Sequence, residues 1–249
     1  MAECWAQSLG DCSDKMSREH IFSEGVHFAD EVTVQGLSWC EDQPRTVGLS
    51  SLTAKILCKK HNSDLSFADA AAISTIKFFE EAIRLHGFRS KYRPANWTRR
   101  NFKVNGHELE SWFLKTLINI TFESEKLMGK YATQPGKPTR ELVEIAFQRR
   151  RFDPPAGLYT IPAVGKDAVL DGSIRVSVMT QTPPITIGAV FLFAGMRFFL
   201  YLNDDFTPGP ENFKFHHDPV VSTTPFLYRF RKVAFPVHGK SSHTVTFNW

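Results

Sequence analysis

The positions of the cysteines constrain this sequence more than any other feature. All four of them, Cys4, Cys12, Cys40 and Cys58, lie in the first 58 residues of a 249-residue chain. The first residues include neither a basic start nor an apolar run, which predicts no secretory signal and a reduced, cytoplasmic compartment. In such a compartment, clustered thiols indicate metal binding rather than disulfide bonds.

Cys58 and His61 form the sharpest local motif, C-x-x-H. A thiolate and an imidazole at this spacing can supply half of a tetrahedral zinc site. We expect Cys4 and Cys12 to supply the other half, although their spacer is longer than the usual two to four residues. Cys40 is the alternative to either of them, and a set of unrelated buried thiols is the remaining interpretation.

Composition limits the class of protein. Apolar residues make up 42% of the chain, which predicts a substantial core and excludes wholesale disorder. The net charge of +4 permits a nucleic-acid partner without requiring one. Gly195 and Arg197 interrupt the longest apolar stretch, residues 185–202, which therefore indicates two buried strands rather than a membrane span.

Composition also divides the chain into three segments. Residues 1–87 hold every cysteine, residues 88–104 form a polar basic connector, and residues 105–249 form a module of helices followed by strands. Apolar spacing of three and four predicts helices over 62–87, 107–129 and 139–150. Runs of β-branched and aromatic residues predict strands at 31–35, 52–57, 157–161, 173–179, 186–193, 197–202, 226–235 and 244–247. The expected fold class is α+β, with a mainly antiparallel sheet in the last module.

Two motifs together carry a family resemblance. Glu19-His20 is an acidic-His pair, and Cys58-x-x-His61-Asn62 opens a helix. This pattern resembles the HNH nucleases, with His61 in the place of the second cysteine of a C-x-x-C-N element. The resemblance covers about residues 4–75 and implies an N-terminal, zinc-stabilised ββα-metal domain.

The resemblance also implies a role for each of these residues. His20 would be the general base, because an imidazole is largely neutral near pH 7. Glu19 and Asn62 would hold a catalytic Mg²⁺ or Mn²⁺, since these hard cations take oxygen ligands. Thr53 stands where the family has a residue that orients the base, with Ser51 as another candidate. The zinc would be structural and would attach the loop of the acidic-His pair to the helix start.

The connector is a second candidate site. Guanidinium and ammonium groups neutralise phosphates, and aromatic rings stack on bases. The residues that could bind nucleic acid in this way are Arg89, Lys91, Arg93, Trp97, Arg99, Arg100 and Lys103. A solvated linker whose aromatic residues anchor into the core is the alternative interpretation.

The function implied by the resemblance is that of a metal-dependent endonuclease. It would hydrolyse phosphodiester bonds, leaving 5′-phosphate and 3′-hydroxyl ends, and double-stranded DNA is favoured over RNA as substrate. A bacterial restriction or antiviral defence effector is implied by analogy only. The alternative is a catalytically inactive zinc-binding adaptor for nucleic acid or protein. A homo-oligomer, an activating partner, and recognition, oligomerisation or sensing by residues 105–249 all stay open.

Overall fold

The structure is a computed structural model that describes most of the chain. The described residues are 3–26, 31–35, 40, 43–48, 51–91, 100–161, 174–181, 184–193, 196–209, 211, 225–236 and 242–249. This part of the chain has a mixed α+β fold. None of its helices is long and apolar enough to cross a membrane.

The N-terminal elements build one strand pair and one strand–helix junction. In chain order they are η1 (Gln7–Leu9), β1 (Met16–His20), η2 (Glu24–Val26), β2 (Glu31–Gln35), β3 (Arg45–Gly48), β4 (Thr53–Cys58) and α1 (Lys59–Asp64). Strands β1 and β4 pair antiparallel. Cys58 ends β4 and also caps α1, because its sulfur accepts the backbone N–H of His61. The thiol therefore fixes the angle at which the helix leaves the strand.

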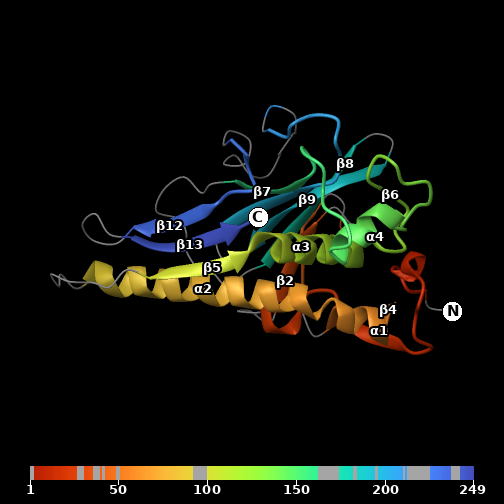
Figure 1. Cartoon of the computed structure of the whole chain (residues 1–249), viewed down its shortest axis with the longest axis horizontal. Coiled ribbons are helices and arrows are strands. Elements are labelled where there is room, and N and C mark those ends of the chain that lie inside the picture. The colour runs from red at the N-terminus through yellow and green to blue at the C-terminus, as the bar shows by residue number, and fades with distance from the viewer. Residues whose placement is uncertain are drawn as a thin grey trace.

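A central helix organises the middle of the chain. The elements here are α2 (Ser66–Lys91), β5 (Asn101–Asn105), α3 (Gly106–Thr121), β6 (Leu127–Met128) and α4 (Arg140–Ala146). The Asn105 side chain caps α3 by accepting the N–H of Glu108 at 3.3 Å. Helix α3 is buried on nearly all sides, as expected of a helix in the middle of a core. Figure 1 shows it between the long helix α2 and the strands of the large sheet.

Strands dominate the remainder, and most pairs are antiparallel. They are β7 (Gly157–Ile161), β8 (Ile174–Gln181), β9 (Ile185–Phe193), β10 (Met196–Tyr201), β11 (Leu227–Tyr228), β12 (Lys232–Pro236) and β13 (Ser242–Asn248). Within the described residues an eight-stranded sheet has the order β11-β7-β10-β9-β8-β2-β3, with β6 beside β9, and a three-stranded sheet has the order β12-β13-β5. The N-terminal strand β2 thus pairs in parallel with β8 from the far half of the chain.

Most predicted elements are confirmed, but several boundaries are wrong. The first predicted helix starts at Lys59 and breaks at Leu65. Its second part, α2, continues through Gly87 to Lys91, because one glycine lowers helix stability by only about 1 kcal/mol. Helix α3 ends at Thr121 instead of Gly129, since residues 127–128 pair with β9. The strand predicted over 226–235 divides into β11 and β12 at Arg229, whose φ is 38°.

The core joins residues from both ends of the chain. Trp5, Phe22 and Leu57 belong to the same buried apolar cluster as Trp112 and Phe247. Helix α3 supplies the middle of this cluster and contacts α2, α4 and β10. Side chains of α3 therefore face the β1–β4 pair as well as the large sheet.

A four-residue Cys/His cluster and the polar groups beside β1

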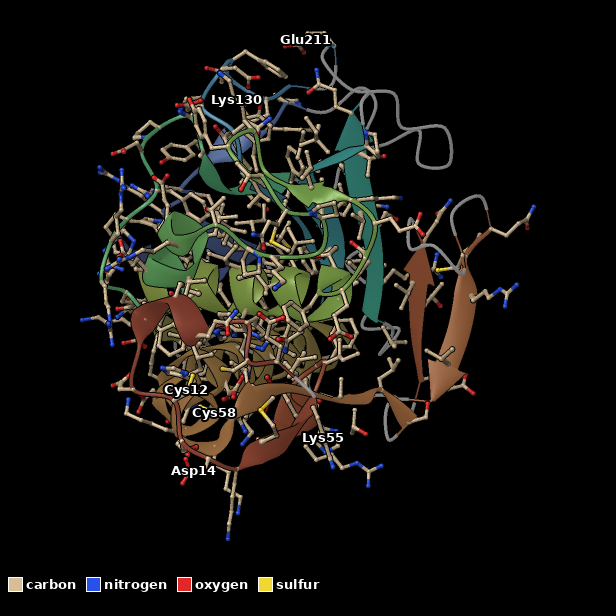
Figure 2. The ribbon with its side chains drawn as sticks, turned by 90° about the vertical axis from the view of Figure 1, so that its right-hand side faces the viewer. Cys12, Asp14, Lys55, Cys58, Lys130 and Glu211 are labelled. Atoms are coloured by element: carbon tan, nitrogen blue, oxygen red, sulfur yellow. The ribbon has the colours of Figure 1, made fainter. Side chains whose placement is uncertain are left out.

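Cys4, Cys12, Cys58 and His61 meet at one point, and their ligand atoms all lie within 4.8 Å of one another. Cys4 and Cys12 lie on either side of η1, Cys58 ends β4, and His61 is in the first turn of α1. Figure 2 shows Cys12 and Cys58 side by side at one end of the molecule, with Lys130 at the other. Cys40 is buried but is not a member of this cluster.

The nitrogen–sulfur distances in the cluster match those of a tetrahedral metal site. The Nδ1 atom of His61 lies 3.3 Å from the sulfur of Cys58, 3.4 Å from that of Cys4 and 3.6 Å from that of Cys12. Zn–S bonds of about 2.3 Å and a Zn–N bond of about 2.0 Å put ligand sulfur and nitrogen about 3.5 Å apart. These four residues could therefore hold a metal ion such as zinc.

Asp11 completes the surroundings of His61. Its Oδ1 atom lies 3.2 Å from His61 Nε2, on the side of the ring opposite the sulfurs. When Nδ1 binds a metal, Nε2 carries the proton and donates to this carboxylate, which fixes both the tautomer and the ring orientation. Lys60 in turn contacts Asp11 at 2.8 Å. Asp11 was not predicted from the sequence, because a single loop aspartate beside a cysteine has no distinguishing pattern.

The three thiols differ in acidity. Burial raises the pKa of Cys4 to about 12 and also raises the pKa of Cys12. Burial acts in the same direction on Cys58, but hydrogen bonds from the backbone N–H groups of His61 and Ser13 outweigh it and lower its pKa to about 6. Cys58 is therefore the thiol that is ionised at neutral pH without help from a metal.

A row of polar contacts joins β1 to the helices. Asn62 Nδ2 donates to Ser17 Oγ at 3.0 Å. Glu19 is two residues further along β1, beyond a point where the β1–β4 register shifts. It is 5% exposed, and its Oε1 lies 2.7 Å from Lys115 Nζ of α3. Strand β1 thus contacts α1 through Ser17 and α3 through Glu19.

Lys115 also binds a second carboxylate. Its Nζ lies 2.9 Å from both carboxylate oxygens of Asp69, which lies in the first turn of α2, beyond the break at Leu65. Ser23 donates to the same carboxylate and accepts from Trp112 Nε1 at 2.8 Å. We call Ser17, Glu19, Asn62, Asp69 and Lys115 the polar row. Asp69 and Lys115 were not among the residues predicted from the sequence, because they meet Glu19 only through tertiary packing.

The environment of Glu19 opposes its ionisation. Burial raises the pKa of this carboxyl, the ammonium of Lys115 lowers it, and the negative charge of Asp69 raises it. The nearby His20 also lowers it, and the net pKa lies above the ordinary value.

His20 and Thr53 lie on the face of the strand pair opposite to Glu19, because adjacent residues of a strand point to opposite faces. They are cross-strand partners in the β1–β4 register, and both are half-buried. Thr53 Oγ1 accepts a hydrogen bond from the exposed Arg18 Nε at 2.9 Å. Within the described part of the chain, no side chain or backbone group hydrogen-bonds the His20 ring. Ser51 is exposed and donates to the carbonyl of Gly48 at 2.6 Å.

The structure describes only part of the connector, residues 88–104. Arg89 and Lys91 belong to helix α2, but the structure does not describe their side chains. Arg93, Trp97 and Arg99 are outside the described residues. Arg100 Nη1 contacts Glu81 at 2.9 Å, and Lys103 is exposed on β5. The predicted nucleic-acid contacts of this segment stay a prediction.

Comparison with known proteins adds no relative. No family model, curated protein or solved structure matches the chain. Function therefore has to be argued from the chemistry of the Cys/His cluster and the polar row.

Proposed function

We propose that this protein is a zinc-stabilised endonuclease of the HNH type, which hydrolyses nucleic-acid phosphodiester bonds with Mg²⁺ or Mn²⁺. The hydrogen bond from Asn62 to Ser17 carries the proposal. It joins the helix-start asparagine to β1, the strand that carries Glu19 and, on its opposite face, His20. DNA is favoured over RNA as the substrate.

Zinc has a structural role in this proposal. Bound by Cys4, Cys12, Cys58 and His61, it attaches the N-terminal loop to the junction of β4 and α1. The strand pair β1–β4 is small, and two strands alone are marginal in water. A metal that joins the loop, strand and helix supplies the stability that such a unit lacks.

His20 acts as the general base. Its half-buried ring leaves it accessible to a water molecule, and the described residues leave both ring nitrogens without a hydrogen bond. A neutral imidazole at that position accepts the proton of the attacking water. Thr53, its cross-strand partner, is the residue that the resemblance assigns to orienting the ring, and its hydroxyl accepts from Arg18 in this structure.

Oxygen donors suited to Mg²⁺ or Mn²⁺ lie in the polar row. Asn62 donates its Nδ2 to Ser17 of β1, so its amide oxygen is the atom left for a cation, and the Glu19 carboxylate belongs to the same strand. This donor set fits a hard divalent cation. When bound, the cation stabilises the charge that develops on the phosphate.

A plasmid-cleavage assay tests the nuclease proposal. Wild-type protein and His20→Ala are purified in parallel, and zinc content and melting temperature are measured before incubation with plasmid and Mg²⁺ or Mn²⁺. We expect cleavage by the wild type and a loss of about 100-fold or more in His20→Ala at unchanged zinc content. The variant also controls for contaminating nuclease. Equal cleavage by both proteins would contradict the assignment of His20.

Cysteine variants test the zinc site separately. Cys58→Ala removes a ligand, so we expect loss of bound zinc and a lower melting temperature. Cys40→Ala is the matched control, because Cys40 is also buried but lies outside the cluster. Elemental analysis of the purified proteins gives zinc per chain. Full zinc content in Cys58→Ala would rule out the proposed ligand set.

The second candidate is a catalytically inactive zinc-binding adaptor for nucleic acid or protein. The ion pair between Glu19 and Lys115 favours it, because an ammonium group at 2.7 Å already neutralises the proposed ligand. An adaptor would contain zinc and bind nucleic acid or protein, but would cut neither DNA nor RNA with either cation.

A further inference from the structure

Lys115 is an unusual residue for the interior of a protein. It is 1% exposed, and lysine is almost never fully buried unless it is paired. Its ammonium group is shared by two carboxylates, Glu19 Oε1 at 2.7 Å and Asp69 Oδ1 and Oδ2 at 2.9 Å. With both carboxylates ionised, this group would carry one excess negative charge, which is one reason why the environment opposes the ionisation of Glu19. Such an arrangement is costly to bury and gives little stability that apolar residues could not supply.

Each carboxylate is fixed by the element that carries it. Glu19 is a residue of β1, and Asp69 is in the first turn of α2. Ser23 donates to Asp69 and is itself held by Trp112 of α3. The ammonium of Lys115 is therefore the common contact of three elements that are distant in the sequence.

Helix α3 holds the chain on both sides of His20. Lys115 contacts Glu19, the residue before His20. Asn119 lies one helical turn beyond Lys115. Its side chain donates at 3.5 Å to the carbonyl of Ile21, the residue after His20. The same Asn119 side chain accepts a hydrogen bond from Trp5 Nε1 at 3.0 Å, next to the zinc ligand Cys4. The proposed base is thus flanked by two residues that α3 fixes.

We infer that Lys115 is a positioning residue for the proposed nuclease, holding the Glu19 carboxylate and thereby His20 in the geometry that cleavage requires. This inference rests on the proposed function. It also gives residues 105–249 a defined task, because α3 completes a site whose other groups come from the first 69 residues. Lys115 acts through Glu19 and does not touch the substrate.

The first test compares three variants on α3 by steady-state cleavage of DNA with Mn²⁺. We expect Lys115→Met to lower kcat by about 100-fold, the effect of a misplaced catalytic group, with KM within about threefold of wild type. Lys115→Arg restores the charge and recovers kcat to within about tenfold of wild type. Glu110→Gln is the matched control, since Glu110 is a charged residue of the same helix with 2% exposure and lies outside the polar row.

The control separates positioning from folding. Glu110 accepts the backbone N–H of Leu158 at 2.9 Å, so its substitution disturbs the fold without touching Glu19. Equal losses of kcat in Glu110→Gln and Lys115→Met at matched melting temperatures would overturn the inference. So would wild-type kcat in Lys115→Met, or no recovery in Lys115→Arg.

A double variant keeps the test decisive if Lys115→Met does not fold. Glu19→Gln/Lys115→Met removes both charges of the Glu19 contact, and the Asp69 carboxylate keeps its hydrogen bond from Ser23 and its partial exposure to solvent. If Lys115 acts through Glu19, the double variant has the kcat of Glu19→Gln within about threefold. A further drop of about 100-fold would overturn the inference. A wild type that cuts no nucleic acid would instead refute the proposed function.

Discussion

His61 is the most constrained side chain of the Cys/His cluster. It is fully buried, with Nδ1 facing three sulfur atoms and Nε2 facing Asp11. Phe147 packs edge-on against the ring at a centroid distance of 5.5 Å. The ring therefore has one orientation and, once a metal binds Nδ1, one tautomer.

Zinc affinity should depend on Asp11. Asp11→Ala removes the acceptor for His61 Nε2, and loss of such an outer partner weakens metal sites by about 10- to 100-fold. Competition with a chromophoric chelator measures the affinity. Asp14→Ala is the control, because Asp14 is an exposed aspartate of the same loop and should leave the affinity unchanged. An unchanged affinity in Asp11→Ala would show that the carboxylate does not fix the ring.

Zinc binding should release about two protons per chain at pH 7.5. Zinc binds thiolates, so a thiol that is still protonated must lose its proton. The raised pKa values of Cys4 and Cys12 keep both protonated at this pH, whereas the pKa of about 6 leaves Cys58 ionised. Titration calorimetry of the metal-free protein in buffers of different ionisation enthalpy counts the protons. A release of about three protons per chain would show that Cys58 is protonated like the other thiols.

The ligand set could be predicted from the sequence, whereas its surroundings could not. Thiols and imidazoles are few, and the C-x-x-H spacing of Cys58 and His61 already limits the geometry. Cys12 was expected from the sequence with Cys40 as the alternative, and the fold decides between them, because Cys12 is in the cluster and Cys40 is not. Lys115 and Glu19 come together only through tertiary packing, and no local pattern in either segment indicates the other.

Among the elements, those with a strong apolar repeat were predicted and those without one were missed. Helix α3 and strand β7 carry clear patterns and are buried along their length. Strand β3 has no buried residue, and β5 has one buried residue in a polar segment. The sequence of each therefore lacks the apolar pattern that would distinguish it from a loop. Strand β1 was expected only from the family resemblance.

The cap of α4 should contribute measurably to stability. Thr139 Oγ1 accepts the backbone N–H of Leu142 at 3.2 Å, and loss of such a cap costs about 1 kcal/mol. Thr139→Ala should therefore lower the free energy of unfolding by about that amount in urea denaturation. Thr133→Ala is the control, since Thr133 is exposed in the preceding loop and should have little effect. Equal stability of the two variants would exclude the cap as a contributor.

The whole molecule is tied together by contacts between its two halves. Strand β2 pairs with β8, and Trp5 and Leu57 share an apolar cluster with Phe247. The division at residues 87 and 105 was made from composition, which reports local polarity and cannot show which strands pair across that distance.

We expect the full chain to unfold in one cooperative transition. The two halves share a sheet and an apolar cluster, so neither can lose its packing without exposing the other. Circular dichroism and tryptophan fluorescence in urea should give coincident curves. Two separated transitions would contradict this expectation and would support independent units.

The contact between Glu19 and Lys115 has a consequence for how the protein is made in a cell. Ribosomes deliver the chain from its N-terminus, so the four residues of the Cys/His cluster and Asn62 emerge well before α3. In a growing chain all four are thus present while Glu19 still has no ammonium to face. Translation that stopped short of α3 would release a fragment with the four residues of the Cys/His cluster but without the completed polar row.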